Sequence, residues 1–299
     1  MPMRITILGS GTSTGVPVVG CGCRVCSSDD PRDRRTRASI WLRAEGLSIV
    51  FDTSTEFRLQ AVAAGLRRVD AVFITHAHAD HVHGIDDLRP ISHHTPIPLY
   101  ADMRTLSEIE ERFSYIFHPT PNNSAKPRLE MNRIDAESGG PVRVRKRLEA
   151  EAEAEAEAGT GAADYHGAGG GTHGGAGNTG PAGGPVVEVL PVPVLHGSLP
   201  ILGFRVGSFA YLTDCSGIPE ASYGLLEGVQ VVVIDALRFR SHPTHFNVDQ
   251  SVEAVRRIGA EKAYLTHLCH DVSYRELAAA LPEGIYPAYD GLELTRSEE

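Results

Sequence analysis

The chain has 299 residues, of which 38 are Asp or Glu and 28 are Lys or Arg, so its formal net charge is −10. Residues 149–184 hold 12 of the 31 glycines, six of the acidic residues and no Lys or Arg, so the acidity and the glycine excess are largely local. The remainder is weakly acidic and ordinary in composition, which excludes a disordered or fibrous class and argues against a broad nucleic-acid-binding surface.

Short apolar runs rich in β-branched residues recur along the chain and predict buried strands. In chain order they are residues 5–8, 49–51, 72–74, 192–195, 211–212, 231–234 and 263–265. Helical spacing of apolar residues occurs at 55–64, 105–113, 249–258 and 274–281. Strands and helices mixed in this way predict a layered α/β architecture.

Six of these predicted strands are followed by a side chain that can bind a cation or a proton. The six residues are Asp52, His76, His196, Asp214, Asp235 and His267. If the strands share a sheet edge, their ends converge on one rim, which is where layered α/β proteins bind ligands. For Asp235 taken alone, a turn or helix-capping role is an equally good interpretation.

The segment 149–184 begins with alternating Glu and Ala and continues as a Gly, Ala and Thr tract. It cannot bury enough apolar surface to offset the entropy lost on ordering. Strand-like sequence resumes at Val186. We therefore predict one domain over residues 1–299, interrupted by a disordered insertion at 149–184.

A compact cluster of metal-binding residue types follows the predicted strand 72–74. His76, His78, Asp80 and His81 are separated by alanines or directly adjacent, so one tight loop can present them to two neighbouring ions. The alternative is that these are exposed histidines without a bound metal. Further ligands elsewhere in the chain would favour the metal site.

Together with the strand-end residues, this cluster resembles the metallo-β-lactamase superfamily of binuclear hydrolases. The match in order covers nearly the whole chain apart from the insertion, and it implies a four-layer αββα sandwich holding two divalent ions, Mn or Zn. The resemblance implies that one ion is held by His76, His78 and His196, and the other by Asp80, His81 and His267. It further implies that Asp214 bridges the two ions and that Asp52 orients the ligand loop from behind.

Three of the five cysteines, Cys21, Cys23 and Cys26, are too close in sequence to suggest a disulfide framework and favour one shared ion. His270 lies three residues after His267, so it can point away from the active site and complete a tetrahedral zinc site. A reduced surface loop is the alternative. This combination resembles the phosphodiesterases of phosphonate breakdown that open phosphoribosyl 1,2-cyclic phosphate, which are relatives of the tRNA 3′-processing nucleases.

Hydrolysis of a phosphodiester fits these residues. Two adjacent cations supply a bridging hydroxide as nucleophile and neutralise charge on the phosphoryl oxygens. The departing oxygen needs a proton, and His245 matches the catalytic histidine of the resembled phosphodiesterases. His242, nearby, is better explained as a loop residue.

We therefore expect a metal-dependent phosphodiesterase whose substrate is a small phosphodiester, cyclic or otherwise unhindered. The alternatives are a tRNA 3′-processing endonuclease, which needs an RNA-gripping arm, and a metal-binding protein without turnover. No stretch approaches the roughly 20 apolar residues that cross a bilayer, and the N-terminus has too short an apolar run for a signal peptide. We expect a cytoplasmic protein with no nucleic-acid or membrane partner, and the sequence leaves a homodimer open.

Overall fold

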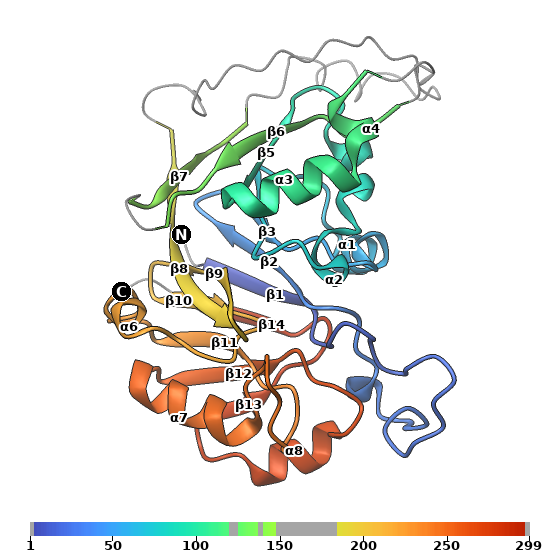
Figure 1. Ribbon diagram of the computed structural model, residues 1–299, viewed down its shortest axis with the longest axis vertical. Coiled ribbons are helices and arrows are strands. Elements are labelled where there is room, and N and C mark those ends of the chain that lie inside the picture. Colours follow the sequence, from blue (N-terminus) through green and yellow to red (C-terminus); the bar gives the residue numbers. More distant parts are fainter. Residues whose placement is uncertain (1–2, 120–124, 137–139, 148–183, 297–299) are drawn as a thin grey trace.

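The computed structural model describes residues 3–119, 125–136, 140–147 and 184–296. Within these residues, two seven-stranded sheets pack face to face and helices cover their outer faces (Figure 1). This arrangement confirms the predicted αββα sandwich. The insertion predicted at 149–184 lies, except for Gly184, outside the described residues.

The first sheet contains the N-terminal strands and the last strand of the chain. Its order is β14 (Glu293–Arg296), β1 (Met3–Gly9), β2 (Ser39–Ala44), β3 (Leu47–Phe51), β4 (Ala71–Phe73), β5 (Ile97–Ala101) and β6 (Leu129–Arg133). The helical segments of this half are a 3₁₀ turn at Pro31–Asp33, α1 (Phe57–Ala64), α2 (Ala79–Val82), a 3₁₀ segment at Ile85–Ile91, α3 (Met103–Arg112) and α4 (Ser114–Phe117).

The second sheet contains the strands from the middle and the C-terminal part of the chain. Its order is β13 (Ile285–Pro287), β12 (Lys262–Thr266), β11 (Val231–Asp235), β10 (Phe209–Leu212), β9 (Leu199–Val206), β8 (Val186–His196) and β7 (Val142–Arg145). Its helices are α6 (Glu220–Leu225), α7 (Val248–Ile258) and α8 (Tyr274–Ala280).

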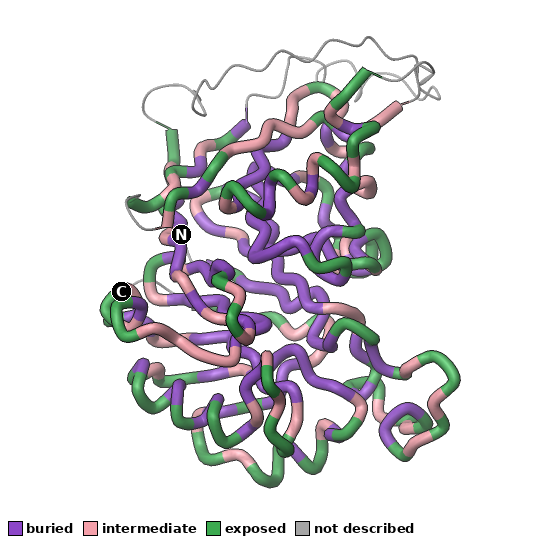
Figure 2. Tube along the Cα trace, viewed as in Figure 1, coloured by how far each residue is buried: buried purple, intermediate pink, exposed green. Residues whose placement is uncertain are grey.

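The main apolar core lies between the two sheets and is rich in aromatic side chains. The rings of Phe51 and Phe204 lie 5.4 Å apart, and Phe73 and Phe204 make an edge contact at 5.3 Å. Two further clusters fill the space between each sheet and its helices. Buried positions therefore follow the strands, whereas the outer helices alternate buried and exposed residues (Figure 2).

Among the described residues, no helix has both the length and the apolar character that crossing a membrane requires.

The strands that carry the polar end residues belong to both sheets. In the first sheet β3 runs parallel to β4. In the second, β10, β11 and β12 are parallel, and β8 runs in the same direction because both β8 and β10 are antiparallel to β9. The expectation of one shared sheet edge was too simple, because in a sandwich the carboxyl ends of strands in two stacked sheets form the rim.

Candidate metal centre and catalytic site

The histidine-rich loop connects β4 to α2. The backbone N–H of Thr75 donates to Asp52 Oδ1 at 2.8 Å, which fixes the start of the loop. His78 is the N-cap of α2, and its side chain makes no capping hydrogen bond. Asp80 and His81 follow in the first helical turn. The loop can therefore present donors from its extended part and from its helical part.

The end of α2 needs a glycine to bring this loop against the first sheet. A side chain at Gly84 would meet the Ser54 carbonyl oxygen at 2.3 Å and Phe57 Cβ at 2.4 Å. The Gly84 N–H donates to the Thr53 carbonyl oxygen at 3.0 Å. The absence of a side chain thus lets the ligand loop dock on the segment that follows β3.

Four of the predicted ligands form a first donor set, namely His76, His78, His196 and Asp214. Each offers one ligand atom, and these atoms lie within 4.8 Å of one another. His76 and Asp214 are buried, with His76 Nε2 3.8 Å from Asp214 Oδ2, whereas His78 is exposed. Strand β8 and the turn after β10 thus bring two residues more than 100 positions away to the ligand loop.

The second donor set consists of Asp80, His81, Asp214 and His267, all of them buried. The Nε2 atoms of His81 and His267 lie 3.2 Å and 3.1 Å from Asp214 Oδ1. They lie 3.3 Å and 3.6 Å from Asp80 Oδ2. Asp214 turns Oδ2 toward the first set and Oδ1 toward the second, so its carboxylate can be shared by both.

The donor atoms themselves fit two divalent cations. Among the described residues, buried atoms without a hydrogen-bond partner include Nε2 of His76, His81 and His267 and Oδ2 of Asp80. A buried polar atom left unsatisfied costs about 1–3 kcal/mol, so four of them at one centre favour a bound cation. Imidazole nitrogen and carboxylate oxygen suit Zn²⁺ and Mn²⁺ alike.

The opposite ring nitrogens of two candidate ligands are held by fixed acceptors. His81 Nδ1 donates to Asp52 Oδ2 at 2.8 Å, and His196 Nδ1 donates to the Thr244 carbonyl oxygen at 2.8 Å. These bonds set the tautomer and direct Nε2 toward the centre, as metal-binding histidines require. Asp52 therefore lies behind His81, on the side of the ring away from the other candidate ligands.

Three of the strand-end residues have left-handed backbone conformations. The φ angles of Asp52, Asp214 and His267 are 60°, 55° and 59°. This region is uncommon for residues other than glycine and costs of order 1–3 kcal/mol at each position. The strain turns each side chain sharply at the end of its strand, and such strain tends to cluster at functional sites.

The charges at the centre complement a cation. Burial lowers the pKa of His76 well below its ordinary value, which keeps the imidazole a neutral donor. Burial by itself would raise the pKa of Asp214, but the His267 and His81 imidazoles hold it well below its usual range. Burial likewise opposes protonation of His81, yet the nearby carboxylates raise its pKa, Asp214 and Asp80 most strongly. This concentration of negative charge would also retain a divalent ion.

His245, the predicted general acid, lies at the border of the donor sets. Its ring centroid is 4.7 Å from those of His196 and His267. Its Nδ1 is 2.9 Å from Oδ2 of the fully buried Asp235. The sequence left a capping role for Asp235 open, and the structure instead pairs its carboxylate with His245. His242 lies in the same loop, 5.1 Å from His245 between ring centroids.

Backbone and hydroxyl contacts fix the segment that carries this pair. The Phe246 N–H donates to the Cys215 carbonyl oxygen at 2.7 Å, and the Leu237 N–H donates to the Phe246 carbonyl oxygen at 3.0 Å. Ser251 Oγ on α7 donates to the Asp235 carbonyl oxygen at 2.5 Å. The loop is thereby attached to the ends of β10 and β11.

The cysteines of the N-terminal loop meet His270 as the sequence spacing suggested they could. The Sγ atoms of Cys21, Cys23 and Cys26 lie 3.4, 3.5 and 3.6 Å from His270 Nδ1. The Cys26 N–H donates to Cys23 Sγ and lowers the pKa of that thiol to about 6, whereas burial raises the pKa of Cys26 to about 11. Four convergent donors of this kind suit a tetrahedral zinc ion.

Arg35, which the sequence analysis did not single out, ties this site to the active-site rim. Its side chain is fully buried and pairs with Asp33 at 2.9 Å. It donates to the carbonyl oxygens of Cys269 at 2.9 Å and Val272 at 2.8 Å, on either side of His270. The sequence gives no sign that Arg35 is buried, because the two carbonyl oxygens that accept from it belong to a distant loop.

Replacing Cys21 and Cys23 together by Ser tests the structural role of this site. We expect bound metal to fall from about three to about two ions per chain, because two of four donors are lost. Thermal stability should fall more than turnover does. Elemental analysis and thermal unfolding measure both, with Ser27→Ala in the same loop as the control. Unchanged metal content would rule out this ion site.

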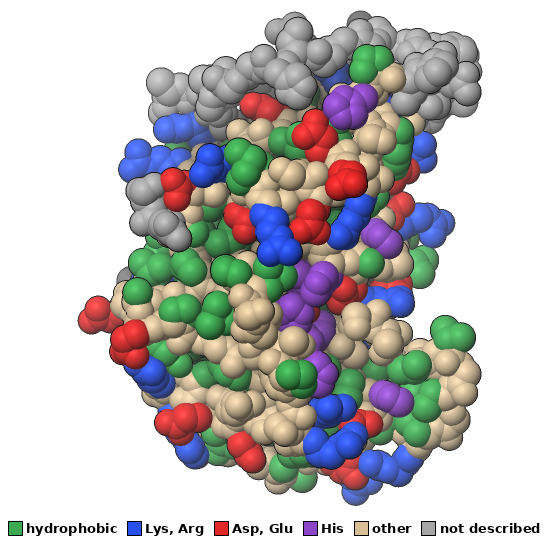
Figure 3. Space-filling model, viewed as in Figure 1, with side chains coloured by type: hydrophobic (Ala, Val, Ile, Leu, Met, Phe, Trp, Pro, Cys, Tyr) green, Lys and Arg blue, Asp and Glu red, His purple; other side chains and the backbone are tan. Residues whose placement is uncertain are grey.

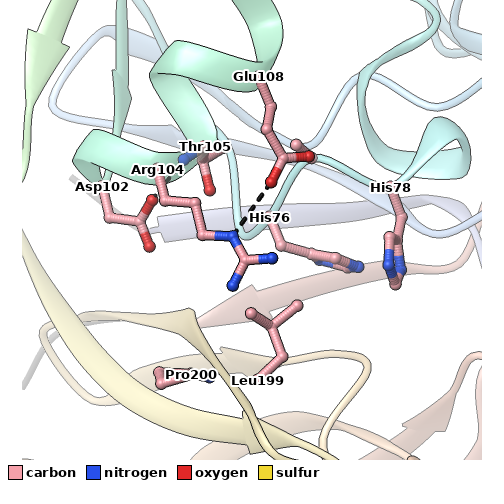
Figure 4. Close-up of a pocket in the computed structure, with 9 residues that line it drawn as sticks. His76, His78, Asp102, Arg104, Thr105, Glu108, Leu199 and Pro200 are labelled. Atoms are coloured by element: carbon pink, nitrogen blue, oxygen red, sulfur yellow. Dashed lines mark hydrogen bonds and ion pairs between the residues drawn. The ribbon is translucent and has the colours of Figure 1, made fainter.

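One face of the molecule exposes the centre. Histidine side chains gather in a vertical column in the middle of this face, with Lys and Arg side chains above and below it (Figure 3). A pocket of about 50 Å³ adjoins the first donor set, lined by His76, Ala77, His78, Asp102, Arg104, Thr105, Glu108, Leu199 and Pro200 (Figure 4). It lies between α3 and the turn from β8 to β9.

Residues 48–268 match the family model of the β-lactamase superfamily domain. A diphosphatase from the PhnP family, known from its crystal structure, is 37% identical, with a TM-score of 0.78 over 99% of this chain and 97% of that one. The short form of human tRNase Z is 18% identical with a TM-score of 0.59, over 99% of this chain and 100% of that one. The second likeness is one of fold alone.

An octanoyltransferase of Porphyromonas gingivalis strain W83 is 35% identical over 300 residues. The match covers 99% of this chain but 52% of that protein. The chain therefore spans about half the length of this curated relative.

Proposed function

Because the chain belongs to the β-lactamase superfamily and, within it, to the PhnP family of metal-dependent hydrolases, we propose that it is a binuclear phosphodiesterase. Its proposed substrate is a small, cyclic phosphodiester such as phosphoribosyl 1,2-cyclic phosphate. One observation carries the proposal: two donor sets that share Asp214 lie beside a histidine paired with a buried carboxylate.

The donor sets define which residues would hold the two ions, Mn²⁺ or Zn²⁺. His76, His78 and His196 would hold one, Asp80, His81 and His267 the other, and Asp214 both. When bound, such a pair of ions activates water and neutralises charge on phosphoryl oxygens. Cys21, Cys23, Cys26 and His270 would hold a structural zinc ion.

The protein's own residues orient the proton transfers. Asp235 accepts from His245 Nδ1, which leaves Nε2 directed away from the carboxylate and able to carry the proton for the departing oxygen. Burial lowers the pKa of His245, and the nearby carboxylates of Asp214 and Asp80 oppose that shift. Asp52 holds His81 in place from behind the centre.

The relatives differ in how much their names support the proposed phosphodiesterase function. A diphosphatase cleaves at phosphorus, as the proposed diesterase does, and this relative matches the present chain from end to end. The octanoyltransferase is about twice as long, so its name does not support acyl transfer here. RNA cleavage is less favoured, because the likeness to tRNase Z concerns the fold and the chain is acidic, with a net charge of −10. A cytoplasmic location would keep the cysteines reduced for zinc.

Parallel assays test the proposed function. A cyclic ribose phosphate, bis(4-nitrophenyl) phosphate and a precursor tRNA would be offered to the protein with added Mn²⁺ or Zn²⁺. We expect the highest kcat/KM for the cyclic diester, because an unhindered ring reaches buried donors that a folded RNA does not. The Asp214→Asn variant gives the background rate of hydrolysis in each assay. Turnover of the tRNA alone would overturn the proposal, and turnover of none would favour a metal-binding protein.

A further inference from the structure

The loop between β1 and β2 carries the three cysteines that meet His270. Figure 1 shows this loop projecting from the body of the sandwich. The donor atoms of the four residues lie within 4.8 Å of one another. Cys21 and Cys23 are half-buried, whereas Cys26 is buried. A small solute can therefore reach two of the thiols, and the third lies behind them.

Cys23 and Cys26 are arranged as an accessible thiol and a buried partner. They are three positions apart in a turn that the Ser27 N–H closes by donating to the Cys23 carbonyl oxygen at 2.9 Å. The Cys26 N–H donates to Cys23 Sγ at 3.4 Å. Side chains three positions apart on a helical turn lie on the same face. The two sulfur atoms can therefore form a disulfide with little movement of the chain.

The cysteine site shares one short segment with the catalytic centre. His270 follows His267 by three residues, and Cys23 Sγ lies 3.8 Å from the His270 carbonyl oxygen. The same segment is attached to the end of β1, because the Leu268 N–H donates to the Ser10 carbonyl oxygen at 3.0 Å. A change at the cysteines therefore acts on the residues that directly follow a proposed ligand.

His267 needs this support because its backbone is strained. Its φ angle of 59° is left-handed, and a residue keeps such a conformation only where the surrounding contacts fix it. Arg35 supplies part of the support by donating to the carbonyl oxygens of Cys269 and Val272. Coordination of His270 at the cysteine site would supply another part. Loss of that coordination would leave His267 with fewer restraints.

We propose that Cys23 and Cys26 form a reversible oxidation site for hydroperoxides, through which the cysteine loop controls metal binding at the catalytic centre. The Cys23 thiolate attacks hydrogen peroxide at the O–O bond, which leaves a sulfenic acid on Cys23 and releases hydroxide. The Cys26 thiol then attacks the sulfenic sulfur, so that an S–S bond forms and water departs. The peroxide is reduced and the two cysteines are oxidised.

The disulfide removes two of the four donors at the cysteine site. Cys21 and His270 alone cannot complete a tetrahedral zinc site, so the ion leaves. The segment that follows His267 then loses one of its attachments. This inference rests on the proposed zinc ion at the cysteines and is independent of which phosphodiester is hydrolysed.

Hydrogen peroxide tests the inference on the zinc-loaded wild-type protein. We expect peptide mapping to show a disulfide between Cys23 and Cys26, and a chromogenic chelator to detect release of about one zinc ion per chain. The affinity of the catalytic donor sets for Mn²⁺, measured by calorimetry, should fall roughly tenfold to hundredfold, because the support of His267 is weakened. Dithiothreitol together with zinc should restore both the ion and the affinity.

Cys215→Ala is the matched control, because Cys215 is a fully buried thiol outside the cysteine site. This variant should form the same disulfide and release the same ion. Zinc and thiols that persist in peroxide, a different disulfide, or an unchanged Mn²⁺ affinity after oxidation would each contradict the inference. If the untreated protein holds no ion at the cysteines, the inference fails with that site, and turnover of the cyclic diester decides the proposed function separately.

Discussion

Replacing Asp214 by Asn should remove nearly all hydrolytic activity and most active-site metal. Asp214 belongs to both donor sets, with one carboxylate oxygen toward each. An amide of the same shape removes the negative charge that both ions would share. We expect kcat/KM to fall by at least about a thousandfold, since ions of this kind supply both the nucleophile and charge stabilisation.

Metal analysis distinguishes this effect from simple unfolding. The variant should keep about one ion per chain, at the cysteine site, and lose about two. Glu253→Gln is the control, since Glu253 is a carboxylate on α7 that is 75% exposed and belongs to none of the donor sets. If Asp214→Asn retains all of its metal, Asp214 does not bridge the two sets.

Replacing His245 by Ala should slow diesters with poor leaving groups by about 10² to 10⁴, which is the usual contribution of a general acid. Diesters that release 4-nitrophenolate should lose less than about tenfold, because this anion departs without a proton. Metal content should stay unchanged, since His245 belongs to neither proposed ion set. Steady-state rates on a cyclic ribose phosphate and on bis(4-nitrophenyl) phosphate measure the difference.

Two neighbouring residues sharpen this experiment. Asp235→Asn keeps the size of the side chain but weakens the orientation of His245, so we expect a loss of roughly 10- to 100-fold on the poor leaving group. His242→Ala, in the same loop, should have little effect. An equal loss of rate on both substrates for His245→Ala would contradict the assignment of His245 as general acid.

The local sequence was sufficient for the strands and helices with strong apolar patterns. The run predicted at 231–234 lies within β11, and the helix predicted at 249–258 is α7, whose start is fixed by a capping box of Asn247 and Gln250. Less regular elements escaped prediction. Strand β9, for example, contains a proline and a glycine and acquires its strand conformation from pairing with β8 and β10.

The candidate site likewise has a part that local sequence predicts and a part that it does not. The His76–His81 cluster and the cysteine triplet are local patterns, and their residue types and spacing reveal metal-binding chemistry without a structure. The partner of His245 is not a local pattern. Asp235 is ten positions away at the end of a strand, where a carboxylate has several common roles, and only the turn back from β11 brings it to His245.

The sequence by itself therefore determined which side chains could bind metal and which segments form regular strands or helices. Ligand spacing within a loop and apolar periodicity are properties of neighbouring residues. The tertiary structure alone decided which distant groups meet. It placed strand ends from two sheets on one rim, turned three of them through left-handed backbone conformations, and set Arg104 beside the first donor set. These contacts depend on the packing of two sheets and their helices, and that packing is a property of the whole chain.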